Sequence, residues 1–169
     1  MNAVYIMEKQ VSITLGRPSA IQDFDSDFLP PILKQTDGSL FPSHVKLARL
    51  AGKVQWKLYS PEATQRGPGA IERDVTALEI EVEQWRLHHI PETPGDPRIP
   101  SSTNNTRTNH IINTYITYLN LIGTVKRARL IYQLDNSPLI TANDSVEAAR
   151  TIAKLFIDNP DLVLDPAAW

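Results

Sequence analysis

The apolar residues of this chain recur almost everywhere at steps of three and four, which is the period of an α-helix. The most regular stripe has a 4-3-4-3 spacing, typical of the seam between two antiparallel helices. It consists of Ile71, Val75, Leu78, Val82 and Trp85. No two segments alternate apolar and polar residues as a pair of half-buried strands would. The sequence therefore predicts an all-α fold.

Five helices with this period are expected, at residues 2–15, 43–59, 70–88, 107–134 and 144–158. Gly16 fits the C′ position of the first helix, and Pro18 prevents its continuation. Ser43 is the expected N-cap of the second helix. Asp144, with Glu147 three residues later, predicts the start of the last helix as a variant of the capping box.

The remaining apolar stripes complete the predicted core. They are Val4, Met7, Val11 and Leu15; Leu47, Leu50, Ala51, Val54 and Leu58; Ile112, Tyr115, Leu119 and Ile122; and Val146, Ala149, Ile152, Ala153 and Phe156. Gly123 lies inside the fourth helix at a cost of about 1 kcal/mol relative to Ala, so it predicts either close helix packing or a break.

Two long loops rich in Pro separate the helices, at about residues 19–42 and 91–108. The expected architecture is an irregular bundle of about five helices. We expect residues 1–169 to form one partial domain rather than several.

Composition excludes several classes of function. The chain has 169 residues and a net charge of −2, which gives no electrostatic reason to expect direct DNA binding. It contains no Cys, which excludes disulfides, a thiol nucleophile and a thiolate zinc site. No signal peptide and no apolar run of about 18 residues is present, so no membrane contact is expected. No cofactor is expected in this chain.

No group of residues indicates catalysis, so we expect a protein that is not an enzyme, with no catalytic or metal site. The four histidines are His44, His88, His89 and His110. His88 and His89 are adjacent, and a polar role at a helix C-terminus fits them better than metal binding. The Lys126–Arg129 cluster suits phosphate or a nuclear import signal, but a helix-dipole role is favoured.

The segment Leu15-Gly16-Arg17-Pro18 precedes an acidic run, Asp23, Asp25 and Asp27, and then Leu29-Pro30. Further along, a helix ends in Tyr59-Ser60, and Trp85-Arg86 closes the next. This order resembles the fungal-specific transcription factor domain. That domain is the middle regulatory region of fungal Zn(2)-Cys(6) binuclear cluster transcription factors. The chain resembles a truncated form of it that lacks the zinc cluster.

The resemblance implies a non-enzymatic role in transcription regulation in the nucleus, through protein contacts, self-association or intramolecular regulation. DNA would be reached only through a zinc-cluster domain that this chain lacks. The residues that carry the resemblance are expected to be structural or regulatory: Gly16, Arg17, Pro18, Asp23, Asp25, Leu29, Pro30, Trp85 and Arg86. Truncation further predicts that apolar surface on the first two helices stays exposed.

Two alternatives remain open at this level. Arg17 could bind an anion, although an ion pair with one of the three following aspartates is favoured, and these aspartates suit a structural loop better than a Ca²⁺ site. The chain could also be a free-standing helical interaction module or small-molecule-binding module. In that case Trp56, Trp85 and the face formed by Tyr115 and Tyr118 would line an apolar cavity.

Overall fold

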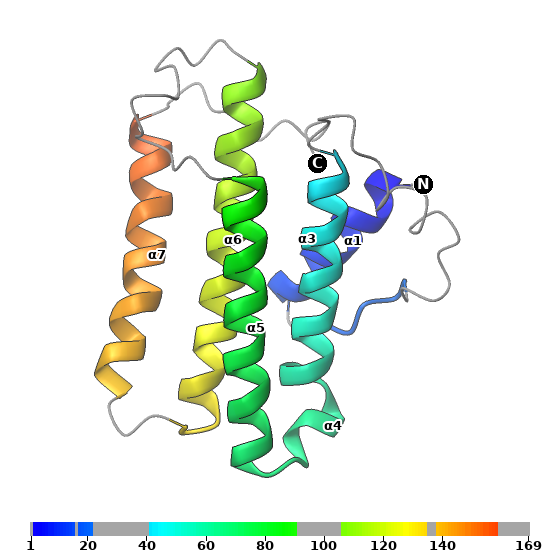
Figure 1. The fold of residues 1–169 in the computed structure, drawn as a ribbon, viewed down its shortest axis with the longest axis vertical. Helices are drawn as coiled ribbons and strands as arrows, with labels where there is room; N and C mark the ends of the chain where they lie inside the picture. Colours follow the sequence, from blue (N-terminus) through cyan, green and yellow to red (C-terminus); the bar gives the residue numbers. More distant parts are fainter. Residues whose placement is uncertain (1, 16, 22–40, 91–105, 135–137, 159–169) are drawn as a thin grey trace. The chain divides into compact units, whose positions relative to one another are not determined.

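Helices make up most of the chain that the structure describes. The computed structural model describes residues 2–15, 17–21, 41–90, 106–134 and 138–158, and no strand occurs among them (Figure 1). Among these described residues, five helices have 14 residues or more: α1 (Asn2–Leu15), α3 (Phe41–Val54), α5 (Pro68–His89), α6 (Thr106–Ile131) and α7 (Pro138–Asp158). The predicted all-α fold is confirmed.

A π-helical turn, η2 (Gln55–Tyr59), continues α3 directly, and the short helix α4 (Pro61–Thr64) follows. Ser60 has extended backbone angles, and its Oγ accepts a hydrogen bond of 3.1 Å from the backbone N–H of Ala63. Pro61 disfavours a helical conformation for the residue before it. The helix therefore ends at Tyr59 as predicted, and Ser60 caps a helix that the sequence analysis missed.

The chain divides into two units, Met1–Asp74 and Val75–Ala168. In the first unit α1 packs along α3, and in the second α6 packs along α7. One buried cluster among the described residues of the first unit contains Tyr5, Ile6, Val45 and Ala48, with Ile21 against it. One such cluster in the second unit contains Ile112, Ile116 and Leu155, with Tyr115 and Ile152 against it. The assignment of residues 1–169 to a single domain stays a prediction, and the two predicted loops lie mostly outside the described residues.

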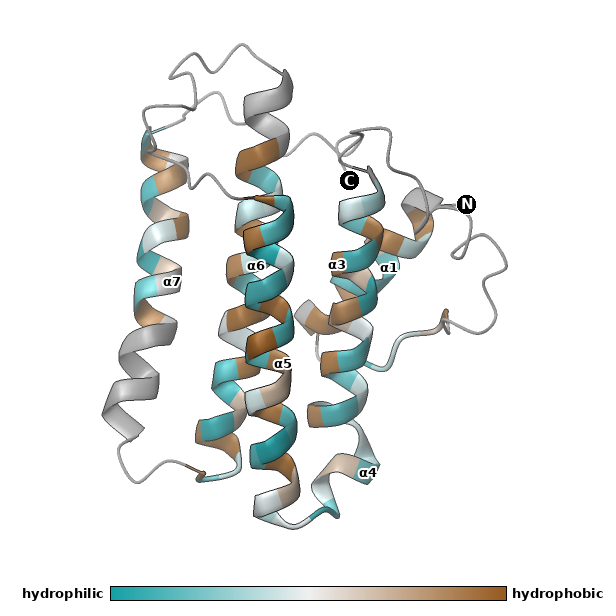
Figure 2. Cartoon of the chain, in the orientation of Figure 1, coloured by the Kyte–Doolittle hydropathy of each residue, from teal (hydrophilic) through white to brown (hydrophobic). Residues whose placement is uncertain are grey.

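Three predicted stripes are buried. In α5 the five stripe residues are at most 6% exposed, and in α3 and η2 the five are at most 8% exposed. In α6, Ile112, Leu119 and Ile122 are buried, while Tyr115 is half-buried. Figure 2 shows the corresponding alternation of hydrophobic and hydrophilic bands along these helices.

The predicted face of α1 is wrong. Val4 and Leu15 are each 59% exposed, and the stripe residues Met7 and Val11 are also exposed. The buried face instead carries Tyr5, Ile6, Lys9 and Ser12. The helix has apolar residues on every side, so periodicity alone does not select the face that packs. The expected exposed apolar surface is therefore present on α1, whereas the stripe of α3 is covered.

Two predicted helix starts are also wrong. α3 begins at Phe41, so Ser43 lies in its first turn and is buried. α7 begins at Pro138, so Asp144 lies within the helix rather than at its cap. Pro is well suited to the first turn of a helix, because its missing N–H needs no partner there.

The stripe predicted for α7 faces solvent over much of its length. Val146, Ala149 and Ala153 are exposed, whereas Ile152 and Leu155 pack against α6. The side chain of Phe156 lies outside the described residues. The last helix is therefore rotated relative to the predicted stripe.

Gly123 marks neither a break nor close packing. α6 continues through it, and a Cβ at this position would meet nothing within 4 Å. The helix ends instead at Ile131, followed by Gln133 at φ 53°. Two hydrogen bonds, from Gln133 N to Leu130 O (3.2 Å) and from Leu134 N to Arg129 O (2.9 Å), give this end the Schellman pattern.

We predict that Gly123→Ala raises the free energy of unfolding by about 1 kcal/mol, because Ala favours the helix and restricts the unfolded chain. Urea denaturation measures the change. Gly52→Ala is the matched control, since its new methyl would lie 3.2 Å from Lys9 Nζ and force that side chain to move. A Gly123→Ala protein no more stable than the parent would contradict the prediction.

Candidate functional site

The end of α1 turns the chain back along the helix. The backbone N–H of Arg17 donates a 2.9 Å hydrogen bond to the carbonyl of Ser12, five residues earlier. This is the bond expected when a residue in the left-handed conformation follows the last helical residue. Gly16 lies outside the described residues, so its assignment as C′ stays a prediction.

Glu8 joins this returning segment to the helix. Its Oε1 accepts hydrogen bonds from Ser12 Oγ (2.9 Å) and the backbone N–H of Ala20 (2.6 Å). Its Oε2 accepts a third from Ser19 Oγ (2.7 Å). Burial alone would raise the pKa of Glu8, but the hydrogen bonds from Ser19, Ala20 and Ser12 hold it below its ordinary value. The carboxylate therefore stays ionised and fixes the turn.

Lys9 is the other charged residue of α1, and it is only 3% exposed. Its Nζ donates a 2.6 Å hydrogen bond to the carbonyl of Ile21 and lies 5.4 Å from the centre of the Tyr5 ring. A buried ammonium needs such partners, because its desolvation is costly. Glu8 and Lys9 thus hold residues 19–21 from two sides.

We call the residues that carry the family resemblance the signature residues. The structure describes only some of those that lie between residues 16 and 30. Arg17 and Pro18 are exposed. Gly16, Asp23, Asp25, Leu29 and Pro30 lie outside the described residues, as does the proposed ion pair of Arg17. Sequence reasoning missed Glu8 and Lys9, although they are the only charged residues between residues 2 and 15. Two adjacent charges on an otherwise uncharged helix could have indicated that these side chains have specific partners.

Trp85 and Arg86, the second part of the signature, lie in the last turns of α5. Trp85 is 6% exposed, and its ring centre lies 5.4 Å from that of His89. Arg86 donates from Nε (2.8 Å) and Nη2 (2.6 Å) to Glu83 Oε1. This hydrogen-bonded pair raises the pKa of the Arg86 guanidinium.

Glu83 uses its second oxygen to hold α6. Oε2 accepts a 2.7 Å hydrogen bond from the hydroxyl of Tyr118, whose ring lies 5.9 Å from the Arg86 guanidinium and stacks on Tyr115 at 5.6 Å. Burial favours protonation of Glu83, but the donors Arg86 and Tyr118 outweigh it and lower its pKa. Burial, together with the hydrogen bond to Glu83, raises the pKa of Tyr118. The cluster therefore holds a charged carboxylate and a neutral phenol.

A second link between α5 and α6 lies nearer the start of α5. Arg129 donates to both oxygens of Glu79, at 3.0 and 2.7 Å, and to Thr76 Oγ1 at 3.3 Å. Together with the Glu83–Tyr118 bond, these contacts show that later residues of α5 lie beside earlier residues of α6. The two segments are therefore antiparallel. Arg129 of the basic cluster is engaged by Glu79, and the predicted helix-dipole role of the cluster stays a prediction.

Asp74 is, after Glu8, a second carboxylate of the first unit that joins separate segments. Asp74 accepts a 2.6 Å hydrogen bond from Lys57 Nζ through Oδ1, and Arg66 through Oδ2. Burial would raise its pKa, but Lys57 and Arg66 lower it. The Lys57–Asp74 ion pair therefore joins η2 to the first turns of α5.

The described residues contain no group of three or more His, Cys, Asp or Glu side chains placed to hold a metal ion. The rings of His88 and His89 lie edge to face, 4.8 Å apart. Trp56 is 64% exposed, so it does not line the predicted apolar cavity. No described helix is both long enough and apolar enough to span a bilayer.

Comparison with known proteins gives one informative similarity. Over 166 residues the chain is 25% identical to an uncharacterized transcriptional regulatory protein of Schizosaccharomyces pombe. The alignment covers 90% of this chain and 20% of that protein, so the chain spans about a fifth of its relative's length. No family model and no solved structure matches the chain. The chain is similar to a transcriptional regulator.

We predict that acid destabilises the first unit partly through Glu8. Its folded-state pKa is lowered, so its contribution is present above the unfolded-state value and is lost as the pH falls from about 5 towards 3. Urea unfolding at several pH values should show a shallower loss for Glu8→Gln than for the parent. Glu62→Gln, at an exposed position, is the control and should keep the parent's slope. Parallel curves for Glu8→Gln and the parent would disprove this role.

We also predict that Tyr118→Phe lowers the free energy of unfolding by about 1–3 kcal/mol, because it leaves a part-buried carboxylate oxygen of Glu83 without its donor. Tyr115→Phe keeps the stacked ring and is the matched control, with a smaller expected loss. Thermal unfolding followed by circular dichroism measures both. Equal losses in the two variants would show that the Glu83 hydrogen bond is unimportant.

Proposed function

We propose that this chain is part of the regulatory region of a fungal zinc-cluster-type transcription factor and acts in the nucleus through protein contacts, without catalysis. The observation that carries the proposal is the 25% identity to a transcriptional regulator over 90% of the chain. It agrees with an independent resemblance, the order of Gly16-Arg17-Pro18, the acidic run, Leu29-Pro30 and Trp85-Arg86 along the sequence.

The local structure supports a non-catalytic role for the signature residues that are described. Arg86 pairs with Glu83 and Trp85 is buried, and these surroundings favour a packing role for both. The three described carboxylates with shifted pKa values are all shifted downward, whereas a general acid or base at neutral pH needs a value near 7.

An exposed surface of the first unit supports protein contact. Val4, Met7, Val11 and Leu15 form an uncharged apolar stripe along α1. Such a stripe suits another protein segment, either from a second copy or from a partner, better than it suits water. DNA would be reached only through a separate zinc-cluster domain.

A reporter assay tests this function. The full chain, fused to a DNA-binding domain of known site in yeast, should change expression of a linked reporter several-fold relative to the DNA-binding domain alone. Leu78→Asp, which buries a charge at a position 1% exposed, should abolish the effect by unfolding the chain. Glu62→Gln should retain it. A stable, nuclear fusion that leaves the reporter unchanged would refute the proposal.

A further inference from the structure

The exposed apolar row on α1 is the longest of its kind among the described helices. We call Val4, Met7, Val11 and Leu15 the α1 stripe; each of these side chains is 44–59% exposed. No other described helix exposes more than two large apolar side chains. Single exposed apolar residues are ordinary, but a contiguous row of them marks an interaction surface. The α1 stripe is therefore expected to be covered by another helix or segment.

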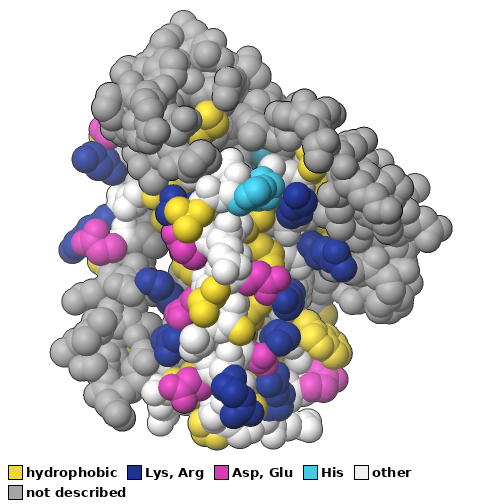
Figure 3. Space-filling model, viewed as in Figure 1, with side chains coloured by type: hydrophobic (Ala, Val, Ile, Leu, Met, Phe, Trp, Pro, Cys, Tyr) yellow, Lys and Arg dark blue, Asp and Glu magenta, His cyan; other side chains and the backbone are white. Residues whose placement is uncertain are grey.

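The α1 stripe contains no charged residue. The two charged residues of α1 are Glu8 and Lys9. The carboxylate of Glu8 accepts three hydrogen bonds, and the ammonium of Lys9 is buried against the returning segment. Figure 3, in contrast, shows charged side chains spread among the hydrophobic ones over the described helices. A charged partner would have to bury its charges here unpaired, which is costly, whereas a second copy brings an equally uncharged stripe.

Side-chain size gives such a pair a direction. In an antiparallel pair Val4 lies opposite Leu15 of the second copy, and Met7 lies opposite its Val11. Every layer then combines one Val with one larger side chain, so the four layers have similar volumes. In a parallel pair each residue meets its own copy, and thin Val layers alternate with thick layers of Met or Leu. Protein interiors pack at uniform density and voids are costly, so the antiparallel pair is favoured.

Arg17 favours the same direction. Its side chain is exposed, and it lies just beyond the last residue of α1. A parallel pair would bring the two Arg17 side chains to the same end, where like charges repel each other. An antiparallel pair places them at opposite ends. The charge next to the stripe and the volumes within it therefore agree on one arrangement.

We propose that two copies of this chain associate through the α1 stripe as an antiparallel helix pair, with the two-fold axis between Met7 and Val11. This inference deepens the proposed function, on which it rests for its setting, by naming what covers the stripe. Four side chains per copy are far fewer than the roughly 20–30 residues per side of a stable interface. The association is therefore weak, with a dissociation constant between about 1 µM and 1 mM.

Sedimentation equilibrium of the full 169-residue chain tests the proposal. The parent should show a monomer–dimer equilibrium between about 5 and 500 µM. Met7→Glu and Val11→Lys should each weaken self-association by about tenfold or more, because each buries an unpaired charge. An equimolar mixture of the two variants should associate again, since the antiparallel pair brings the new carboxylate opposite the new ammonium. A parallel pair would not place these two charges opposite each other.

The absence of cysteine from the chain allows a second measurement with smaller substitutions. A mixture of Val4→Cys and Leu15→Cys chains should form a disulfide-linked dimer under mild oxidation. Neither variant should do so alone. In the antiparallel pair the two copies of residue 4 lie about 16 Å apart along the helices. A disulfide needs Cα atoms within about 7 Å.

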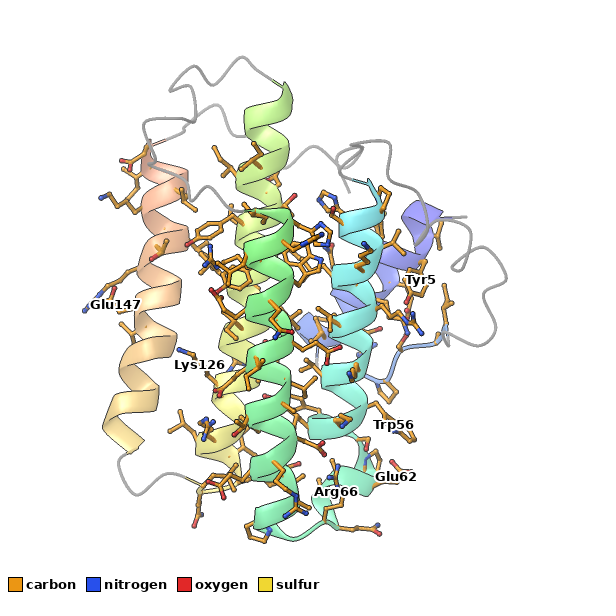
Figure 4. All side chains as sticks on the ribbon, in the orientation of Figure 1. Tyr5, Trp56, Glu62, Arg66, Lys126 and Glu147 are labelled. Atoms are coloured by element: carbon orange, nitrogen blue, oxygen red, sulfur yellow. The ribbon has the colours of Figure 1, made fainter. Side chains whose placement is uncertain are left out.

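Matched controls separate the α1 stripe from general stickiness. Trp56→Ser and Ile157→Ser remove apolar side chains that are 64% and 78% exposed and lie outside the stripe. Figure 4 shows Trp56 projecting away from the ribbon. Both variants should associate like the parent. Circular dichroism should show every variant folded, since all the changed side chains are exposed.

Several results would overturn the proposal. They are a parent that stays monomeric up to about 500 µM, which would assign the stripe to a different protein, self-association that Met7→Glu leaves unchanged, and a mixture of Met7→Glu and Val11→Lys that stays monomeric. All of them are measured on the purified chain, so the reporter assay can succeed or fail independently. Failure of this surface and failure of the proposed function can therefore be told apart.

Discussion

Burial of one apolar stripe per helix is the interaction on which both units depend. The stripe of α5 is almost wholly withdrawn from water, and full burial of one Val, Leu or Ile side chain is worth about 1.5–3 kcal/mol. Most helical stability in proteins comes from tertiary packing of an amphipathic face, so packing rather than intrinsic propensity keeps these helices folded. α1 has two apolar sides, and only the side with Tyr5 and Ile6 is used for this purpose.

Carboxylates then fix how the packed segments are joined. Glu8 accepts hydrogen bonds from Ser19 and Ala20. Asp74 forms ion pairs with Lys57 and Arg66. Glu83 bonds both Arg86 on its own helix and Tyr118 on α6. In each case burial opposes ionisation and the hydrogen bonds outweigh it. These groups are far apart in sequence, so each one ties a turn or a second helix to a packed helix.

Periodicity predicted the existence of the five long helices and the buried face of α5, because a single clean stripe leaves one way to pack. Periodicity did not predict which face of α1 is buried, because one apolar face contains Val4 and another contains Tyr5. It also failed for α7, whose predicted stripe is largely exposed. Glu8 was overlooked because its partners lie beyond a turn that periodicity does not describe. Local chemistry predicted a C-terminal end correctly, because Pro61 ends the helix at Tyr59. It did not predict the starts of α3 and α7, since Ser43 and Asp144 are not caps.

The π turn at residues 55–59 makes one part of the chain unusually tolerant of a change in length. A π turn accommodates one more residue than an α turn, so a single deletion there can rewind the segment to α-helix and keep the register on both sides. The same deletion within α5 would rotate every later side chain by about 100° and move Val82 and Trp85 out of the core. Homologous chains are therefore expected to differ in length by one residue beside Trp56 long before they do so in α5.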